Sequence, residues 1–152
     1  MPSNLRRAQD EYVEYAAGAK KGSLRYAMTV EDAVREADLA IDFVPDELES
    51  KLEIFSLLDR MAPPRTVLCT PTLALSVTDL ASCTYRAERC VGLRAAGADL
   101  LGGALDVVRS RFLVGPVEEA VVEFLVTLGI SVVMIEDEHE PMLVKNALLG
   151  PR

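Results

Sequence analysis

The residues best able to carry metal or nucleophilic chemistry are few and scattered along the chain. The only histidine, His139, lies in the acidic run Glu136–Glu140, where a neighbouring glutamate would have to join it in a metal site. A histidine on such a charged loop is more typically solvated. Ser76 and Ser110 have no evident histidine partner that would activate either hydroxyl. We therefore expect neither a metal site nor a nucleophilic serine.

The cysteines Cys69, Cys83 and Cys90 are an odd number, and their spacing fits no metal site. Free cysteines are among the most buried residues of globular proteins, and disulfides are rare in reducing compartments. The first residues turn charged at once and lack the apolar core of a signal peptide. We therefore expect three reduced, mostly buried thiols in a cytoplasmic protein.

The overall composition excludes several classes of partner. The 152 residues include 16 Lys and Arg against 24 Asp and Glu, which gives a formal net charge of −8, and 50% of them are hydrophobic. Nucleic acids and anionic membranes attract basic surfaces, so neither is expected as a partner. The longest uncharged apolar run, residues 66–77, is too short to span a membrane and contains Pro71. We expect one domain, residues 1–152.

Hydrophobic periodicity and turn residues predict helices that alternate with strands. The expected helices cover residues 4–20, 30–37, 46–61, 75–82, 116–128 and 141–149, and the expected strands cover residues 24–28, 37–44, 66–69, 89–93, 104–108 and 130–135. Thr29 and Asp46 would cap the second and third helices, and Gly129 would end the fifth. Ala37–Val44 (ADLAIDFV) is nearly continuous in apolar residues, as in a strand covered on both faces. The alternation predicts an α/β domain with a mostly parallel sheet and helices on both faces.

Within this pattern, the stretch TVEDAVREADLAIDFVPDELESKLEIF resembles the NAD-binding domain of 3-hydroxyacyl-CoA dehydrogenases. The similarity continues through LDRMAPPRTVLCTPTLALSVTDLA, RAERCVGL, LDVVRS and VEFLVTLGISVVMIEDE, and so covers a core of about residues 24–137. Residues 1–22 resemble the long helix that precedes this region in the family, and residues 138–152 form the remaining tail. The resemblance implies a Rossmann-like fold and descent from an NAD-dependent oxidoreductase of fatty acid metabolism.

The phosphate-binding turn of the family has no counterpart in this sequence. The family begins with a strand, a GxGxxG turn and a helix, and the bare backbone of that turn lets the pyrophosphate approach. Gly102-Gly103 has the wrong spacing to replace this turn. We therefore expect an incomplete Rossmann-like sheet that lacks the first βαβ unit. NAD is implied by the resemblance alone, and no bound cofactor is expected.

The resemblance also places altered residues at the catalytic positions of the family. Arg94 stands where the family has its acid–base histidine, and a guanidinium stays protonated and cannot accept the substrate proton. Asp106 stands where a carboxylate orients that histidine, and we expect it to pair with Arg94 instead. Leu73 replaces a substrate-contacting serine and Pro71 an asparagine, while Asn146 corresponds loosely to another active-site asparagine. No catalytic residue is therefore assigned.

Two positions that contact the cofactor in the family carry the same residue types in this sequence. Asp46 and Lys51 match an acidic residue and a lysine that lie beside the nicotinamide end of the cofactor, so they are the cofactor-binding candidates. The alternative interpretation makes Asp46 a helix cap and Lys51 a solvated side chain. The alternative is favoured because the rest of the cofactor site is absent.

Loss of the first βαβ unit would leave one edge of the strand Ala37–Val44 unpaired. About three donors and three acceptors would lie along it, and each costs about 1–3 kcal/mol if it is buried without a partner. Residues 24–28 could move in and pair with it, a second copy could cover it, or a complementing dehydrogenase chain could supply the missing unit. We expect a homodimer or larger oligomer sealed near this strand.

Three functional hypotheses follow from these features. The chain is a pseudoenzyme that acts as a self-associating or partner-binding module, or it is an NAD-dependent 3-hydroxyacyl-CoA dehydrogenase that is active only when another chain supplies the missing parts. In the third, the sequence belongs to a longer reading frame that carries the GxGxxG turn upstream. A bare scaffold should ignore NADH and acyl-CoA, whereas a depleted enzyme should bind at least one of them.

Overall fold

The structure is a computed structural model that describes residues 3–16, 22–95 and 104–143. Its elements follow one another in the order α1 (Ser3–Ala16), α2 (Val30–Val34), β1 (Leu39–Ile41), α3 (Leu48–Met61), β2 (Val67–Pro71), α4 (Val77–Ser82), a 3-10 turn (Ala87–Arg89), β3 (Cys90–Ala95), β4 (Ala104–Arg109), α5 (Gly115–Thr127) and β5 (Ser131–Glu136). The predicted alternation of helices with strands is confirmed from α2 to β5.

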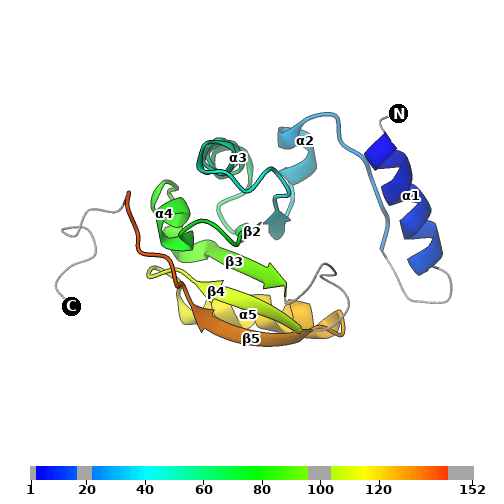
Figure 1. Ribbon diagram of the computed structural model, residues 1–152. Coiled ribbons are helices and arrows are strands. Elements are labelled where there is room, and N and C mark those ends of the chain that lie inside the picture. Colours follow the sequence, from blue (N-terminus) through cyan, green and yellow to red (C-terminus); the bar gives the residue numbers. More distant parts are fainter. Residues whose placement is uncertain (1–2, 17–21, 96–103, 144–152) are drawn as a thin grey trace.

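The strands form one sheet whose spatial order equals the order along the chain, β1-β2-β3-β4-β5 (Figure 1). β1, β2 and β3 run parallel, β4 runs antiparallel to β3, and β5 runs parallel to β4. Only one of the ladders is antiparallel, so the predicted mostly parallel sheet is confirmed. Within the described residues, β1 and β5 are the two edges of this sheet.

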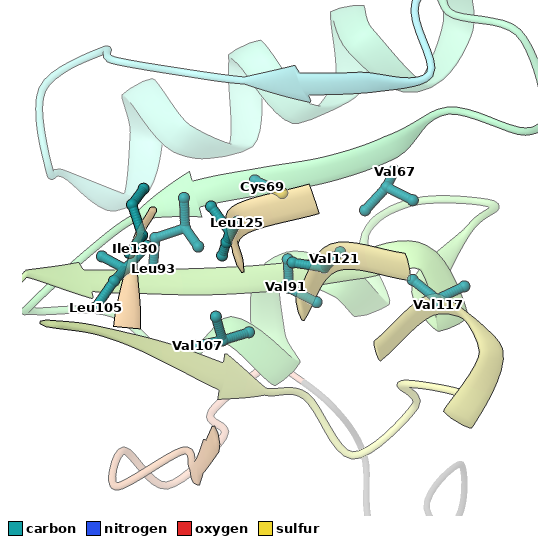
Figure 2. Packing of buried hydrophobic residues seen from close by; sticks show 10 residues of the cluster. All are labelled: Val67, Cys69, Val91, Leu93, Leu105, Val107, Val117, Val121, Leu125 and Ile130. Atoms are coloured by element: carbon teal, nitrogen blue, oxygen red, sulfur yellow. The ribbon is translucent and has the colours of Figure 1, made fainter. Parts of the chain in front are cut away.

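Helices cover both faces of the sheet, as predicted (Figure 1). On one face, α3 and α4 pack on β1, β2 and β3 around Phe55, Leu68 and Leu80. On the other face, Val117 and Val121 of α5 pack against residues of β2, β3 and β4 (Figure 2). The strand residues of this second cluster are Val67, Cys69, Val91, Leu93, Leu105 and Val107.

Two predicted helix ends are confirmed by their local geometry. Thr29 precedes α2, and its hydroxyl accepts a hydrogen bond from the backbone N–H of Asp32 at 3.1 Å, which satisfies one free donor of the first turn. Gly129 follows α5 with a φ of +79°, a left-handed conformation that side chains with a Cβ rarely adopt. These two residues define where α2 begins and where α5 ends.

The strand predicted at residues 24–28 is wrong. This segment is neither helix nor strand, and it lies beside α1, away from the sheet (Figure 1). The hydroxyl of Tyr12 in α1 donates to the carbonyl of Gly22 at 2.6 Å, and the hydroxyl of Tyr26 donates to the carbonyl of Leu5 at 3.3 Å. The segment therefore follows α1, and it does not move inward to pair with β1.

β1 is shorter and less covered than the sequence predicts. It spans Leu39–Ile41, and Ala40 and Asp42 are buried on the side of α3. Ile41 and Phe43 alternate with them and are 38% and 71% exposed. The burial thus follows the period of two that is typical of a strand with one covered face, because β1 lies at the edge of the sheet.

The described part of the tail also departs from its prediction. Residues 141–143 are not helical, and residues 144–149 lie outside the described residues, as do Gly102, Gly103 and Asn146. None of the helices in the described ranges has the length and apolar composition needed to cross a membrane.

The thiols are free, and two of the three are buried, as expected. Burial raises the pKa of Cys90 to about 12 and that of Cys69 further still. A thiol with a raised pKa carries little thiolate at neutral pH, so these two cysteines act as apolar core residues.

Candidate functional site at the carboxyl ends of β1, β2 and β3

Polar and charged side chains gather where the three parallel strands end. The parallel ladder continues past the strands themselves, because the N–H of Asp42 donates to Cys69 and the N–H of Thr72 donates to Leu93, both at 3.2 Å. Successive side chains of a strand point to opposite faces, so Asp42, Thr72 and Arg94 share the face that carries α3 and α4. In parallel α/β sheets this edge is the common location of ligand sites.

Lys51 forms a buried ion pair in this region. Its ammonium donates to Asp42 Oδ1 at 2.7 Å and to the carbonyl of Pro71 at 2.8 Å, and the two charged side chains are 1% and 0% exposed. The interpretation of Lys51 as a solvated side chain is therefore wrong. Asp42 Oδ2 and Thr70 Oγ1, which lie on the same face, are buried without a hydrogen-bond partner in the described structure. Lys51 thus holds the start of α3 against the ends of β1 and β2.

Asp46 does not cap α3. The cap position is Glu47, which makes no capping side-chain hydrogen bond. The carboxylate of Asp46 instead accepts hydrogen bonds from the Thr72 hydroxyl at 2.5 Å and from the N–H groups of Leu73 at 2.9 Å and Ala74 at 3.2 Å. It therefore ties the loop after β1 to the loop after β2, and the capping interpretation is wrong.

The hydrogen bonds of Asp46 keep its carboxylate ionised. Burial by itself would raise the pKa of Asp46, but the bonds from Thr72, Leu73 and Ala74 and the charge of Lys51 outweigh it and hold that pKa below its ordinary value. Asp46 therefore carries its negative charge throughout the neutral pH range.

Arg94 pairs with a residue other than the expected one. Arg94 and Asp106 lie directly opposite each other in the antiparallel ladder of β3 and β4, as their assignment to one site implies. The salt bridge of Arg94 within the described residues, however, joins its Nη1 to Oε2 of Glu138 at 3.6 Å. The predicted Arg94–Asp106 ion pair is therefore wrong, because the chain beyond β5 brings a second carboxylate to the guanidinium.

That chain segment, residues 137–143, forms a strap across α4, and its contacts were not foreseen. Asp137 accepts hydrogen bonds from the N–H groups of Val77 at 2.6 Å and Thr78 at 3.4 Å. In return, Asp79 accepts hydrogen bonds from the N–H groups of Met142 and Leu143, both at 2.8 Å. Part of the charged loop that contains His139 thus binds α4. Of these contacts, the sequence indicates only the start of α4, through the pattern Ser76-x-x-Asp79.

His139 belongs to the same strap. Its Nε2 lies 2.9 Å from the carbonyl oxygen of Leu73 and donates to it, which joins the strap to the loop after β2. Among the described residues, no group of three His, Cys, Asp or Glu side chains is arranged to hold a metal ion. His139 is therefore a hydrogen-bond donor at the protein surface.

These loops line an open cavity of about 340 Å³. It is lined by Phe43, Val44, Asp46, Lys51, Pro71, Thr72, Leu73, Leu93, Arg94 and Ala95. The two cofactor candidates, Asp46 and Lys51, and the residues at the altered catalytic positions, Arg94, Leu73 and Pro71, thus surround one space. The residues that the resemblance assigns to one site therefore lie together, although the sequence did not foresee their partners.

The cavity residues are a poor fit for a nicotinamide ribose. The ammonium of Lys51 is buried and already donates to Asp42 and Pro71, and both oxygens of Asp46 already accept hydrogen bonds. Neither residue therefore presents a free polar group to a cofactor in this arrangement. Their contact with a nicotinamide cofactor stays a prediction.

Sequence comparison relates the chain to a known family of dehydrogenases. A family model described as the NAD-binding domain of 3-hydroxyacyl-CoA dehydrogenase matches residues 4–138. The mitochondrial hydroxyacyl-coenzyme A dehydrogenase of Sus scrofa is 30% identical over 145 residues, which are 95% of this chain and 44% of that protein. A probable 3-hydroxybutyryl-CoA dehydrogenase of Bacillus subtilis is 28% identical over 82% of this chain and 42% of its own length. The chain thus spans less than half the length of these relatives.

Solved structures agree on the fold. A diketoreductase matches with a TM-score of 0.75 and 26% identity, over 90% of this chain and 50% of that chain. The (S)-3-hydroxybutyryl-CoA dehydrogenase of Ralstonia eutropha matches with a TM-score of 0.71 and 18% identity, again over 90% of this chain and 50% of that chain. The second likeness concerns the fold alone, and both support the Rossmann-like arrangement described above.

Proposed function

The chain belongs to the family of the 3-hydroxyacyl-CoA dehydrogenase NAD-binding domain, and we propose that it is a degenerate member that transfers no hydride alone and acts as a self-associating or partner-binding module. The observation that carries the proposal is the environment of Arg94. This residue occupies the position of the acid–base histidine by resemblance, and its guanidinium pairs with Glu138. A group that stays protonated at every working pH cannot take the proton of a hydroxyl substrate.

The edge of the sheet supports the second half of the proposal. Within the described residues, no strand pairs with the outer side of β1, and the apolar side chains of Ile41 and Phe43 beside it are exposed. An open edge offers backbone donors and acceptors to another chain, and apolar neighbours add contact area. A second copy of this chain can pair with the open edge of β1 without any other component. The proposed assembly is therefore a homodimer or larger oligomer joined at β1.

The oligomeric state tests this proposal. We expect the purified protein to have at least the mass of a dimer at micromolar concentration in light scattering after size exclusion, and Ile41→Lys to shift it to the mass of a monomer. Val133→Lys is the matched control, because Val133 is an exposed apolar residue of β5, the other edge of the sheet. A monomeric wild-type protein would contradict the proposal. An assembly that Val133→Lys disrupts while Ile41→Lys leaves it intact would contradict the assignment to β1.

The retained cavity favours a second candidate function. The residues at the carboxyl ends of β1, β2 and β3 still line one open cavity, and Asp46 and Lys51 keep the residue types of the cofactor contacts. In this alternative, the chain is part of an NAD-dependent 3-hydroxyacyl-CoA dehydrogenase whose phosphate-binding unit comes from another chain. Such a complementing chain would also pair with the open edge of β1.

NADH binding and turnover separate the two candidates. The absence of Trp keeps the protein background low, so nucleotide fluorescence can be followed directly during a titration of the protein with NADH. The first proposal expects no saturable binding and no oxidation of 3-hydroxybutyryl-CoA with NAD⁺. The alternative expects binding, and it expects Arg94→His to raise the rate of a mixture with the complementing chain by about a hundredfold or more, since a positioned acid–base group contributes that much.

The cytoplasmic location is part of the same proposal. Fractionation of cells that express the chain with a terminal tag tests it, and recovery of the chain in a membrane or organelle fraction would contradict it.

A further inference from the structure

The guanidinium of Arg94 has two donors for which the described structure provides no acceptor. Nε and Nη2 are buried and make no hydrogen bond, while Nη1 faces Glu138 at 3.6 Å. The Arg94 side chain is only 14% exposed, so water does not fully replace the missing acceptors. A buried donor without a partner costs free energy, and more so when it is charged. Nε and one Nη together form the planar fork that matches the two oxygens of a carboxylate.

The structure already brings a carboxylate to Arg94, but only loosely. The distance of 3.6 Å to Glu138 is longer than a charge-assisted hydrogen bond, and the Glu138 side chain is 77% exposed. An exposed ion pair of this kind contributes little, because solvent screens it. Glu138 therefore acts as a weak internal stand-in that a better-placed carboxylate can displace.

The rest of the cavity wall is mostly apolar. Leu93 is buried, and Phe43 and Leu73 are 71% and 67% exposed at its rim. Covering large apolar side chains around a concave site removes them from water, which contributes favourably to the free energy of ligand binding. The cavity thus combines one cation with aliphatic and aromatic surface.

The other charges of the cavity do not cancel this arrangement. Asp46 is negative and lines the same space, but both of its oxygens are turned toward Thr72, Leu73 and Ala74, whose donors partly neutralise them. The charge of Lys51 is paired with that of Asp42. Of the two cations that line the cavity, Arg94 therefore has more hydrogen-bond donors without an acceptor in the described structure.

We infer that this cavity binds a short-chain aliphatic carboxylate. The carboxylate takes the place of Glu138 beside Nη1 of Arg94. A rotation of the guanidinium then brings one of its two unpaired donors to the second carboxylate oxygen, and the hydrocarbon chain covers Phe43, Leu73 and Leu93. The replacement of an acid–base residue by arginine then changes the site from one that processes a hydroxyl group to one that holds an acid anion.

Hexanoate is the probe for the first test, and hexanamide, which has the same chain without the charge, is its control. Calorimetric titration and the ¹H–¹⁵N resonance of Arg94 Nε follow binding. We expect hexanoate to bind saturably and to shift the Nε resonance downfield, while hexanamide binds at least about tenfold more weakly, because it lacks charge-assisted hydrogen bonds. Equal binding of the two probes, or no binding of hexanoate, would overturn the inference.

Variants of two similar ion pairs locate the site. Arg94→Gln should weaken hexanoate about tenfold or more, and Glu138→Gln should tighten it severalfold, because it removes the internal competitor. Glu140, another residue of the strap, is 91% exposed and pairs with Arg111 at 3.6 Å. Arg111→Gln and Glu140→Gln are therefore matched controls that should leave the affinity for hexanoate unchanged. Should Arg94→Gln fail to fold, the comparison of Glu138→Gln with Glu140→Gln still decides. Equal affinities in those two variants would overturn the assignment.

Discussion

Lys51→Met is expected to lower the free energy of unfolding by about 3–5 kcal/mol, because it leaves a buried carboxylate without its counter-charge. The Asp42 side chain is 0% exposed, and its Oδ1 has Lys51 as its partner at 2.7 Å, while Oδ2 has none in the described structure. Removing the ammonium also deprives the carbonyl of Pro71 of its donor. The loss is therefore the cost of an uncompensated buried charge and exceeds the net value of the ion pair itself.

Urea denaturation followed by circular dichroism measures this loss. The double variant Lys51→Met/Asp42→Leu should recover most of the stability, since an apolar pair of similar volume can replace a buried ion pair at little cost. Arg65→Met is the matched control, because Arg65 pairs with Asp38 at 3.0 Å on the surface, with 58% and 89% of the side chains exposed. A loss below about 1 kcal/mol for Lys51→Met would mean that the pair is not buried in solution.

Arg86→Met is expected to destabilise the protein by a similar amount, about 3–5 kcal/mol. Arg86 is 7% exposed and its Nε donates to Asp59 Oδ1 at 2.9 Å. Its terminal nitrogens donate to the carbonyls of Asp59, Ala62, Pro63 and Thr66. The last carbonyls of α3 have no partner within the helix, so the guanidinium serves as their donor. The apolar replacement leaves a buried carboxylate and several acceptors unsatisfied at once.

The same unfolding experiment checks this expectation. Arg86→Lys keeps the charge but not the planar fork of donors, so it should restore only part of the stability. Arg89→Met is the control, because Arg89 lies in the neighbouring 3-10 turn and its side chain makes one exposed hydrogen bond in the described structure, to the carbonyl of Arg65 at 3.1 Å. Arg86→Met with the stability of Arg89→Met would refute the role of Arg86 in ending α3.

Much of the fold could be predicted because its signals are local. Thr29 and Gly129 act on backbone within a few residues of themselves, so the ends of α2 and α5 follow from residue types alone. Residues 24–28 failed for the opposite reason. Their apolar composition permits a strand, but a strand exists only with a partner, and here α1 supplies contacts that local sequence does not encode.

The site shows the same division between composition and partners. Sequence resemblance placed Asp46, Lys51 and Arg94 in one region, and the cavity confirms that they lie together. It could not show what each residue contacts. The partners of Lys51 and Asp46 lie 9 to 28 residues away along the chain, and Arg94 meets Glu138 only because the strap returns across α4. Such pairings depend on tertiary packing, and residue type gives no signal for them.

The agreement between spatial and chain order in the sheet has a consequence for synthesis. Each strand from β2 to β5 pairs with the strand made immediately before it, so no finished part of the sheet has to reopen to admit a later strand. The sheet can therefore grow one strand at a time as the ribosome releases the chain. α4 differs, since the donors that satisfy Asp79 are Met142 and Leu143, which are translated 63 and 64 residues later. During translation, the nascent sheet would thus carry an incompletely fastened α4 until the strap emerges.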